Sequence, residues 1–266
     1  MTDVQAITLD FGNTLVPFPA GPMAEVVQTT AQWAAERIGC SAAEFTVVWG
    51  EERLRQFVED VPEGREADMD IRVARVLARL RGRPAPADGE RWDDAAAAAD
   101  SEPHEIESAL STYAEAFVRL TPVPPAIGPM LERLSREYRL AILSNWPLDL
   151  AVERFLEAAG WRRYFSAVVV SQRVGVIKPW PRIFEMAAAE LGVASGPAIL
   201  HVGDDPGADV VGAHNVGWRT AWVRIKPEDS PLPVAPHKLD ARPDLMLDSV
   251  LDLETALADL RHASGK

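Results

Sequence analysis

The sequence predicts an α/β protein with a parallel sheet, in which an all-helical segment is inserted into the chain after the first strand. Two patterns along its 266 residues lead to this fold class. In the second half of the chain, short apolar runs alternate with helix-like stretches, which is typical of parallel strands covered by helices on both faces. A further apolar run lies near the N-terminus, and a long segment of helical character separates it from the others.

The first predicted strand, residues 4–11, ends at the turn-forming pair Gly12-Asn13. Four stretches with apolar residues at helical spacing follow it. These predicted helices are 23–38, 42–58, 67–80 and 103–120, and residues 81–100 form a loop or a loop that opens into a short helix. The proline-rich segment 121–125 then acts as a stiff hinge, because proline fixes φ and removes a backbone donor.

Beyond the hinge, five short apolar runs are predicted strands, and the stretches between and after them are predicted helices. The strands are 140–143, 167–170, 199–202, 220–223 and 245–247. The helices are 127–137, 148–159, 181–191, 208–215 and 250–260. A loop with five prolines, residues 226–243, is expected to run over the surface.

The economical arrangement of these elements has two domains. A sheet domain formed by residues 1–16 and 123–266 is interrupted after its first strand by a helical cap formed by residues 17–122. Both parts fall within the usual size of a folding domain.

Charge and composition exclude several classes of partner. The formal net charge of −13 repels a phosphate backbone, so we expect no nucleic-acid partner, although a small phosphorylated substrate remains compatible. No apolar run reaches the roughly 20 residues that span a bilayer, so no membrane partner is expected. The single cysteine, Cys40, and the lack of a signal pattern at the start predict a cytoplasmic protein. The oligomeric state is left open.

Polar side chains follow four of the predicted strands. They are Asp10, Ser144, Lys178 and the group Asp204, Asp205 and Asp209. The carboxyl ends of parallel strands meet at one edge of a sheet, where ligands bind. A carboxylate there can attack phosphorus, and a lysine and hydroxyls can offset and hold the charge of the transferring group. Paired carboxylates also suit Mg²⁺.

Four segments at these strand ends resemble the motifs of haloacid dehalogenase (HAD) superfamily hydrolases. They are Ile7–Leu15, Ile142–Asn145, Val174–Pro179 and His201–Asp205 with Asp209. They occur in order over about residues 4–225, and the long gap after the first matches members with a helical cap between motifs one and two. The resemblance implies a Rossmann-like core and a hydrolase that acts on a small phosphorylated metabolite with Mg²⁺.

The resemblance also implies roles for single residues. Asp10 would be the nucleophile, and Thr14 would hold its loop. Ser144 would bind a phosphoryl oxygen, and Lys178 would neutralise charge on Asp10 and the phosphoryl group.

Binding residues are implied in the same way. Substrate binding would fall to Asn145, Gly12 and Asn13. The Mg²⁺ ligands would be Asp10, the backbone carbonyl of Gly12 and Asp204, with Asp205 or Asp209 supporting the metal site.

Gly12 departs from the family's phosphatases, which usually have a second aspartate two residues after the nucleophile. That aspartate protonates the leaving oxygen and later activates water. Glycine cannot do this acid–base work, whose loss typically costs about 10²–10⁴-fold in rate.

Three functions therefore compete: a Mg²⁺-dependent phosphatase, a metal-free haloacid dehalogenase, and a catalytically impaired protein that binds a phosphorylated ligand or a partner. The dehalogenase group resembles this chain in its non-acidic residue at position 12, but it carries Ser and Asn where this chain has Asp204 and Asp205. Phosphonate cleavage in the family needs a cap lysine, and residues 17–122 contain none.

Other polar and aromatic residues have a structural explanation. Six cap arginines could meet an anionic substrate, but their helical spacing among glutamates favours a solvated face. They are Arg53, Arg55, Arg65, Arg72, Arg75 and Arg79. Trp146 and Trp180 follow motif residues, and we expect them to be packing neighbours.

Overall fold

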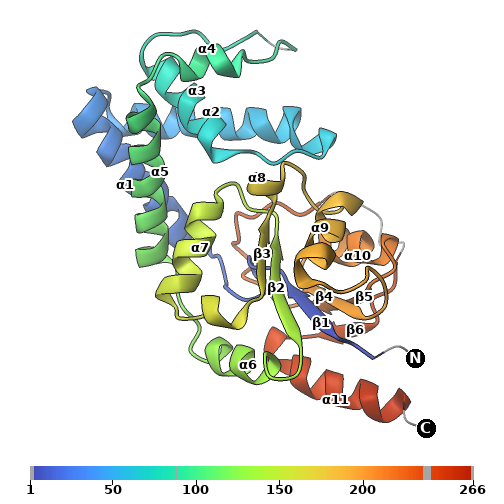
Figure 1. Ribbon diagram of the computed structural model, residues 1–266. Coiled ribbons are helices and arrows are strands. Elements are labelled where there is room, and N and C mark those ends of the chain that lie inside the picture. Colours follow the sequence, from blue (N-terminus) through green and yellow to red (C-terminus); the bar gives the residue numbers. More distant parts are fainter. Residues whose placement is uncertain (1–2, 88, 236–240, 265–266) are drawn as a thin grey trace.

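A computed structural model describes residues 3–87, 89–235 and 241–264. These residues contain a six-stranded, fully parallel sheet with the order β3-β2-β1-β4-β5-β6 (Figure 1). The strands are β1 (Ala6–Leu9), β2 (Arg139–Ser144), β3 (Ala167–Val170), β4 (Ile199–Gly203), β5 (Arg219–Val223) and β6 (Leu245–Leu247). All six predicted strands, and with them the α/β class with a parallel sheet, are confirmed.

The strand β1 lies between β2 and β4 at the centre of the sheet. Successive residues of a strand face opposite sides, so β1 serves two cores. Ile7 and Leu9 belong to the larger hydrophobic cluster, whereas Ala6 belongs to the smaller one. The chain runs outward from β1 to β2 and β3, and later from β4 to β5 and β6. The strand order therefore reverses between β1 and β4, which in open α/β sheets is where ligands bind.

Helices cover both faces of the sheet (Figure 1). The smaller cluster contains side chains of α9 (Pro181–Leu191) and α10 (Gly212–Asn215), and the larger one those of α6 (Ile127–Leu134), α7 (Asp149–Ala158) and α11 (Leu253–Ser264). All five lie within or beside predicted helices. The sequence did not predict α8 (Ser171–Val174), and it predicted ordinary helix from residue 208 where the structure has the π-helical turn η3 (Pro206–Val211). None of the helices in the described ranges is long and apolar enough to cross a membrane.

Among the described residues between β1 and the proline-rich segment 121–125, five α-helices form the insertion. They are α1 (Ala20–Ile38), α2 (Ala42–Glu59), α3 (Met69–Leu80), α4 (Asp94–Ala98) and α5 (Pro103–Leu120). Their bounds agree with the predicted stretches to within three residues, and α4 is the short helix in the 81–100 loop. In Figure 1, α2, α3 and α4 lie above α8, beyond the carboxyl end of β3, and α5 runs beside α7. The division into domains at residues 17 and 122 stays a prediction.

An aromatic cluster joins the inserted helices to the sheet beside the loop that follows β1. Phe11 and Phe18 come from this loop, Phe117 from α5, and Trp146 from the segment after β2. The ring centroids of Phe18 and Phe117 are 5.7 Å apart, and those of Phe11 and Trp146 are 5.6 Å apart. Aromatic pairs at such distances add to the free energy of burial.

Replacing Phe117 with alanine should therefore destabilise the whole protein, by about 3–5 kcal/mol in the free energy of unfolding. Its side chain is fully buried and contacts four aromatic rings. Urea unfolding followed by circular dichroism measures the change. The conservative variant Phe117→Leu should lose clearly less, and equal losses for both would contradict a packing role.

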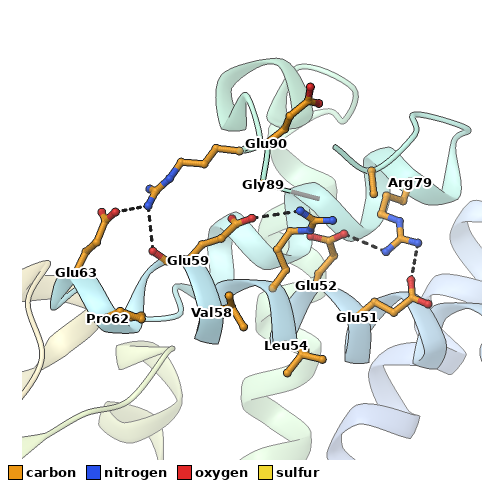
Figure 2. Close-up of a pocket in the computed structure, with 13 residues that line it drawn as sticks. Glu51, Glu52, Leu54, Val58, Glu59, Pro62, Glu63, Arg79, Gly89 and Glu90 are labelled. Atoms are coloured by element: carbon orange, nitrogen blue, oxygen red, sulfur yellow. Dashed lines mark hydrogen bonds and ion pairs between the residues drawn. The ribbon is translucent and has the colours of Figure 1, made fainter. Parts of the chain in front are cut away.

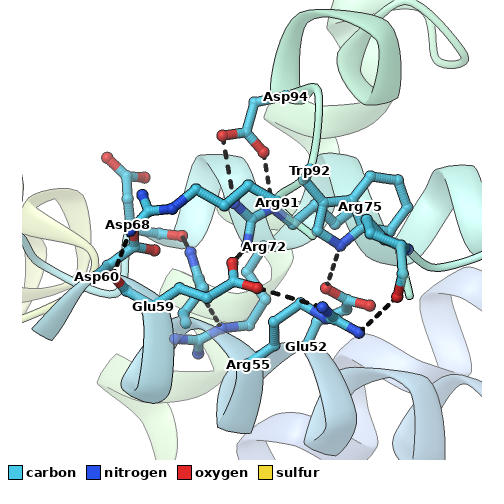
Figure 3. A network of polar contacts seen from close by, with 12 residues as sticks. Glu52, Arg55, Glu59, Asp60, Asp68, Arg72, Arg75, Arg91, Trp92 and Asp94 are labelled. Carbon is cyan, nitrogen blue, oxygen red and sulfur yellow. Dashed lines mark hydrogen bonds and ion pairs between the residues drawn. The ribbon is translucent and has the colours of Figure 1, made fainter. Parts of the chain in front are cut away.

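Buried polar contacts hold the inserted helices to one another (Figure 3). Glu52 of α2 is fully buried, accepting a hydrogen bond from Trp92 Nε1 at 2.9 Å and pairing with Arg79 at 3.0 Å. Arg75 of α3 reaches Asp94 at 2.7 Å. The expected solvated face is therefore wrong for Arg75 and Arg72, each only 3% exposed. Their partners lie within the insertion, so these two arginines are structural.

Candidate active site

The nucleophile candidate Asp10 lies directly after β1, in the crevice where the strand order reverses. Its backbone N–H bonds to the Val202 carbonyl of β4 at 2.8 Å, so the sheet pairing extends to this residue. The chain then turns at Asn13, whose φ of 55° is left-handed, a conformation that asparagine tolerates better than most residues. The Asn13 side chain accepts from the Phe18 N–H and bonds Ser230. Asn13 thus fixes the loop.

Lys178 lies at the centre of the site and is 2% exposed. Its Nζ donates to Asp10 Oδ1 at 2.8 Å, to Asp209 Oδ1 at 2.6 Å and to the Leu143 carbonyl at 2.8 Å. The Asn145 side chain holds the backbone of Lys178. It accepts a hydrogen bond from the Lys178 N–H at 2.7 Å and donates one to the Lys178 carbonyl at 2.9 Å. Asn145, which the sequence predicts to bind substrate, therefore positions the lysine.

Three carboxylates converge beside Lys178. Oxygen atoms of Asp10, Asp204 and Asp209 lie within 4.8 Å of one another. The backbone makes room for them at Gly203, because a Cβ there would lie 2.1 Å from the Asp209 carboxylate. Hard oxygen ligands this close together suit Mg²⁺, which takes carboxylates together with water and phosphate.

Asp205 stands apart from these three carboxylates, although the sequence groups it with the metal residues. Its Oδ1 accepts from the backbone N–H groups of Gly207 and Ala208, and its Oδ2 accepts from the N–H of Ala235. Both oxygens are thus engaged by backbone donors. Asp205 caps η3 and holds a distant loop in place.

His201 and Thr8 support Asp209 from within the sheet, and the sequence analysis gave them no role. The two residues are register partners in β4 and β1, with Thr8 Oγ1 2.8 Å from His201 Nδ1 and His201 Nε2 3.0 Å from Asp209 Oδ1. Burial lowers the pKa of His201. A neutral ring that donates from Nε2 and accepts at Nδ1 satisfies both contacts. The sequence signal that could have identified Thr8 and His201 is that each is a polar residue inside an otherwise apolar predicted strand.

The crowded charges shift the pKa values of the carboxyl groups. Burial raises the pKa of Asp10 to about 6, against the pull of Lys178. Burial and repulsion from Asp10 and Asp209 raise the pKa of Asp204 to about 7. Burial would also raise the pKa of Asp209, but Lys178 and His201 outweigh it and hold that pKa well below its usual range. The site therefore has an excess of negative charge, which a divalent cation would relieve.

These shifts predict how the stability of the metal-free protein depends on pH. Between about pH 4 and 7 the folded state keeps protons on Asp10 and Asp204 that the unfolded chain has lost, so their contribution to stability falls as the pH rises. In a chelating buffer, the free energy of unfolding of Asp204→Asn should fall less over this pH range than that of the wild type. The difference should be on the order of 1–3 kcal/mol. Urea unfolding at several pH values measures it. Parallel curves for the two proteins would contradict the assignment.

Two buried hydroxyls lie at the end of β2 and in the loop after β1. Ser144 ends β2 and is 1% exposed. It lies close enough to Asp10 to lower the pKa of that carboxyl, yet its hydroxyl forms no well-aligned hydrogen bond with any described residue. Thr14 Oγ1 likewise lacks a partner among the described residues. Unsatisfied buried hydroxyls are costly, so Ser144, which lies beside Asp10, suits an oxygen atom of a bound substrate.

The proline-rich loop after β5 runs over the surface, as expected, and it also contacts residues of the site. Lys226 Nζ pairs with Asp204 Oδ2 at 3.0 Å. Ser230 bonds the Asn13 side chain, and Asp229 accepts from the Ala20 N–H. Residues 236–240 of the predicted loop lie outside the described residues. No sequence signal linked this loop to the strand ends.

Gly12 lies beneath an apolar wall that this loop completes. A Cβ at position 12 would lie 2.7 Å from Leu232 Cδ1, 3.3 Å from Trp146 Cζ3 and 3.7 Å from Phe18 Cδ2. The space where an acid–base aspartate would begin is therefore partly filled. Trp146 itself is buried, as the sequence predicts for a packing neighbour, whereas Trp180 is 39% exposed.

The inserted helices also contact the strand ends. The Met69 N–H donates to the Pro147 carbonyl at 2.9 Å, and the Ile177 N–H donates to the Gly64 carbonyl at 2.9 Å. A partly buried side-chain contact between Glu66 and Ser171 lies beside them. These contacts lie on the segments that carry Ser144 and Lys178, so the insertion shields this edge of the sheet from water.

A hollow of about 690 Å³ lies on the insertion, between α2 and the segment that precedes α4 (Figure 2). Its lining residues fall within 51–63, 79 and 85–91, and ion pairs of Arg79 with Glu51 and Glu52 occupy one end. No strand-end residue lines it. The hollow is therefore separate from the chemistry described above.

Comparison with known proteins agrees with this arrangement. The family model for haloacid dehalogenase-like hydrolases matches residues 4–217. The chain is 38% identical over 137 residues to phosphoserine phosphatase of Thermus thermophilus, a match that covers 51% of each protein. It is 33% identical over 113 residues to (S)-2-haloacid dehalogenase of Pseudomonas sp. strain YL, covering 42% of this chain and 47% of that protein. These matches span about half the length of the curated relatives.

Solved structures extend the likeness over nearly the whole chain. A 2-haloacid dehalogenase from Pseudomonas syringae superposes with a TM-score of 0.68 at 22% identity, covering 97% of this chain and 99% of that one. At this identity the likeness concerns the fold. Since the family model covers most of the sequence, and its motifs lie at the strand ends where the carboxylates and Lys178 converge, this chain belongs to the haloacid dehalogenase-like hydrolases.

Proposed function

We propose that this hydrolase is a Mg²⁺-dependent phosphatase that acts in the cytoplasm on a small phosphorylated metabolite, through an aspartyl-phosphate on Asp10. The observation that carries the proposal is the convergence of Asp10, Asp204 and Asp209 beside a single buried lysine. A metal-free reaction has no need of the second carboxylate, Asp204, at that position. Several curated relatives are named as phosphatases, including a glyceraldehyde 3-phosphate phosphatase of Methanopyrus kandleri.

In the first step, a carboxylate oxygen of Asp10 forms a bond to phosphorus while the bond from phosphorus to the leaving oxygen breaks. Lys178, held by Asp209 and Asn145, offsets the charge of the phosphoryl oxygens, and the free hydroxyl of Ser144 can donate to one of them. Gly12 offers no proton, so the leaving oxygen takes one from water. When bound, Mg²⁺ would be held by Asp10 and Asp204 and would neutralise phosphoryl charge.

In the second step, water attacks the phosphorus of the aspartyl-phosphate, and Asp10 is released with inorganic phosphate. No side chain at position 12 is present to take the proton from that water. Breakdown of the aspartyl-phosphate is therefore expected to limit turnover.

A metal-free dehalogenase is the second candidate, because the surroundings of Gly12 are apolar. Leu232, Trp146 and Phe18 would suit a carbon–halogen substrate, and one curated relative is a haloacid dehalogenase. The excess of three carboxylates over two lysines in the site favours the phosphatase. A third candidate, a binding protein without turnover, rests on the missing acid–base group alone.

One assay separates the candidates. Hydrolysis of an aryl phosphate and of a panel of phosphorylated metabolites is measured with Mg²⁺ and with a chelator, and halide release from 2-haloacids is measured in parallel. Phosphate release that requires Mg²⁺ supports the proposal. Halide release in the chelator would overturn it in favour of the dehalogenase, and no turnover of either kind would favour the binding protein.

A further inference from the structure

Asp204 already has a cation of its own. Lys226 Nζ lies 3.0 Å from Asp204 Oδ2, and the two side chains are 29% and 9% exposed. Lys226 follows β5 by three residues, at the start of the loop that contacts the site. None of the four motifs contains this residue.

The contacts divide the three carboxylates between two lysines. Lys178 contacts Asp10 and Asp209, whereas the ion pair of Asp204 is with Lys226. The ammonium of Lys226 thus supplies positive charge at Asp204. A divalent cation would need the same carboxylate as a ligand.

We propose that Lys226 is a built-in counter-cation that competes with the divalent cation for Asp204 and must leave that carboxylate before the cation binds. The inference rests on the proposed metal dependence and deepens it. The loop after β5, through Lys226, would then control how tightly the site binds its divalent cation.

The loop can release the lysine without unfolding. The loop is held elsewhere, at the contacts of the Asp229 side chain with Ala20, of the Pro231 carbonyl with Arg53 and of the Ala235 N–H with Asp205. The lysine side chain is partly exposed, so its ammonium can turn into solvent and be hydrated. Exchange of a monovalent ammonium for a divalent cation also reduces the net negative charge at the cluster.

The test is calorimetric titration of the full chain with Mg²⁺ and with Mn²⁺, at one alkaline pH and fixed ionic strength. Lys226→Met should bind either ion about tenfold more tightly than the wild type, equal to about 1.4 kcal/mol. Lys226→Arg keeps the charge and should bind as the wild type does. Arg224→Met is the matched control, because it removes one positive charge from the same segment at a residue that pairs with Asp248.

The rise in melting temperature on adding Mg²⁺ gives a second readout that needs no turnover, and it should be larger for Lys226→Met. Equal affinities for Lys226→Met, Arg224→Met and the wild type would overturn the inference while leaving the metal-dependent phosphatase intact. Weaker binding by Lys226→Met would also overturn it. If neither ion binds any of the folded proteins, the inference and the proposed metal dependence both fail.

Discussion

Replacing Asp10 with asparagine should abolish Mg²⁺-dependent phosphate release, lowering kcat by at least about 10³-fold. The amide keeps the shape of the side chain and lacks the negative charge that attacks phosphorus. The variant should fold, because an amide oxygen can still accept the hydrogen bond from Lys178 Nζ. Initial rates on the best substrate of the panel, with circular dichroism as a folding check, measure the effect.

Asp248→Asn is the matched control for this substitution. It makes the same chemical change at an exposed carboxylate that pairs with Arg224, outside the site. Its rate should equal that of the wild type. A folded Asp10→Asn protein that keeps more than a tenth of the activity would show that Asp10 is not the nucleophile.

Restoring an acid–base aspartate should accelerate turnover, provided that Leu232 makes room for it. We expect the double variant Gly12→Asp with Leu232→Ala to gain about 10²–10⁴-fold in kcat, the typical contribution of a general acid–base group. Gly12→Asp alone should gain less, because its Cβ would lie 2.7 Å from Leu232 Cδ1 and the leucine would have to shift. Steady-state kcat values of the two single variants and the double variant test this order of activities.

The pre-steady-state course provides a second check on the same residue. The wild type should release the leaving group in a burst and then turn over slowly, whereas the double variant should show no burst. Leu232→Ala alone should keep the wild-type course. A linear rate from the first turnover of the wild type, or no gain in a folded double variant that binds Mg²⁺, would contradict the limiting role of Gly12.

The sheet was predictable because its central strands are buried on both faces and therefore read as largely apolar runs. Such runs at 167–170 and 199–202 became β3 and β4 almost unchanged. The short helix α8 was missed because its four residues are too few for a periodic pattern. The turn η3 was expected to be ordinary helix, since a π-helical turn depends on local backbone geometry more than on the apolar period.

The site was predictable in part. Parallel strands bring residues that directly follow them to one edge, so Asp10, Lys178, Asp204 and Asp209 could be grouped from their positions alone. Asp205 could not be separated from Asp204 by sequence, because two adjacent aspartates differ only in which backbone donors reach them. Arg72 and Arg75 looked exposed because a helical pattern does not show that α2 covers Arg72 and that Asp94 of α4 pairs with Arg75.

The sequence by itself determined the fold class, the insertion after the first strand, and the residue types at the strand ends. These features depend on local periodicity and on the geometry that all parallel sheets share. Only the tertiary structure decided which side chains meet in the site: His201 behind Asp209, Lys226 on Asp204 and Leu232 above Gly12. The loop after β5 has no periodic pattern, and its course is set by contacts more than 170 residues away along the chain, such as Arg53 with Pro231.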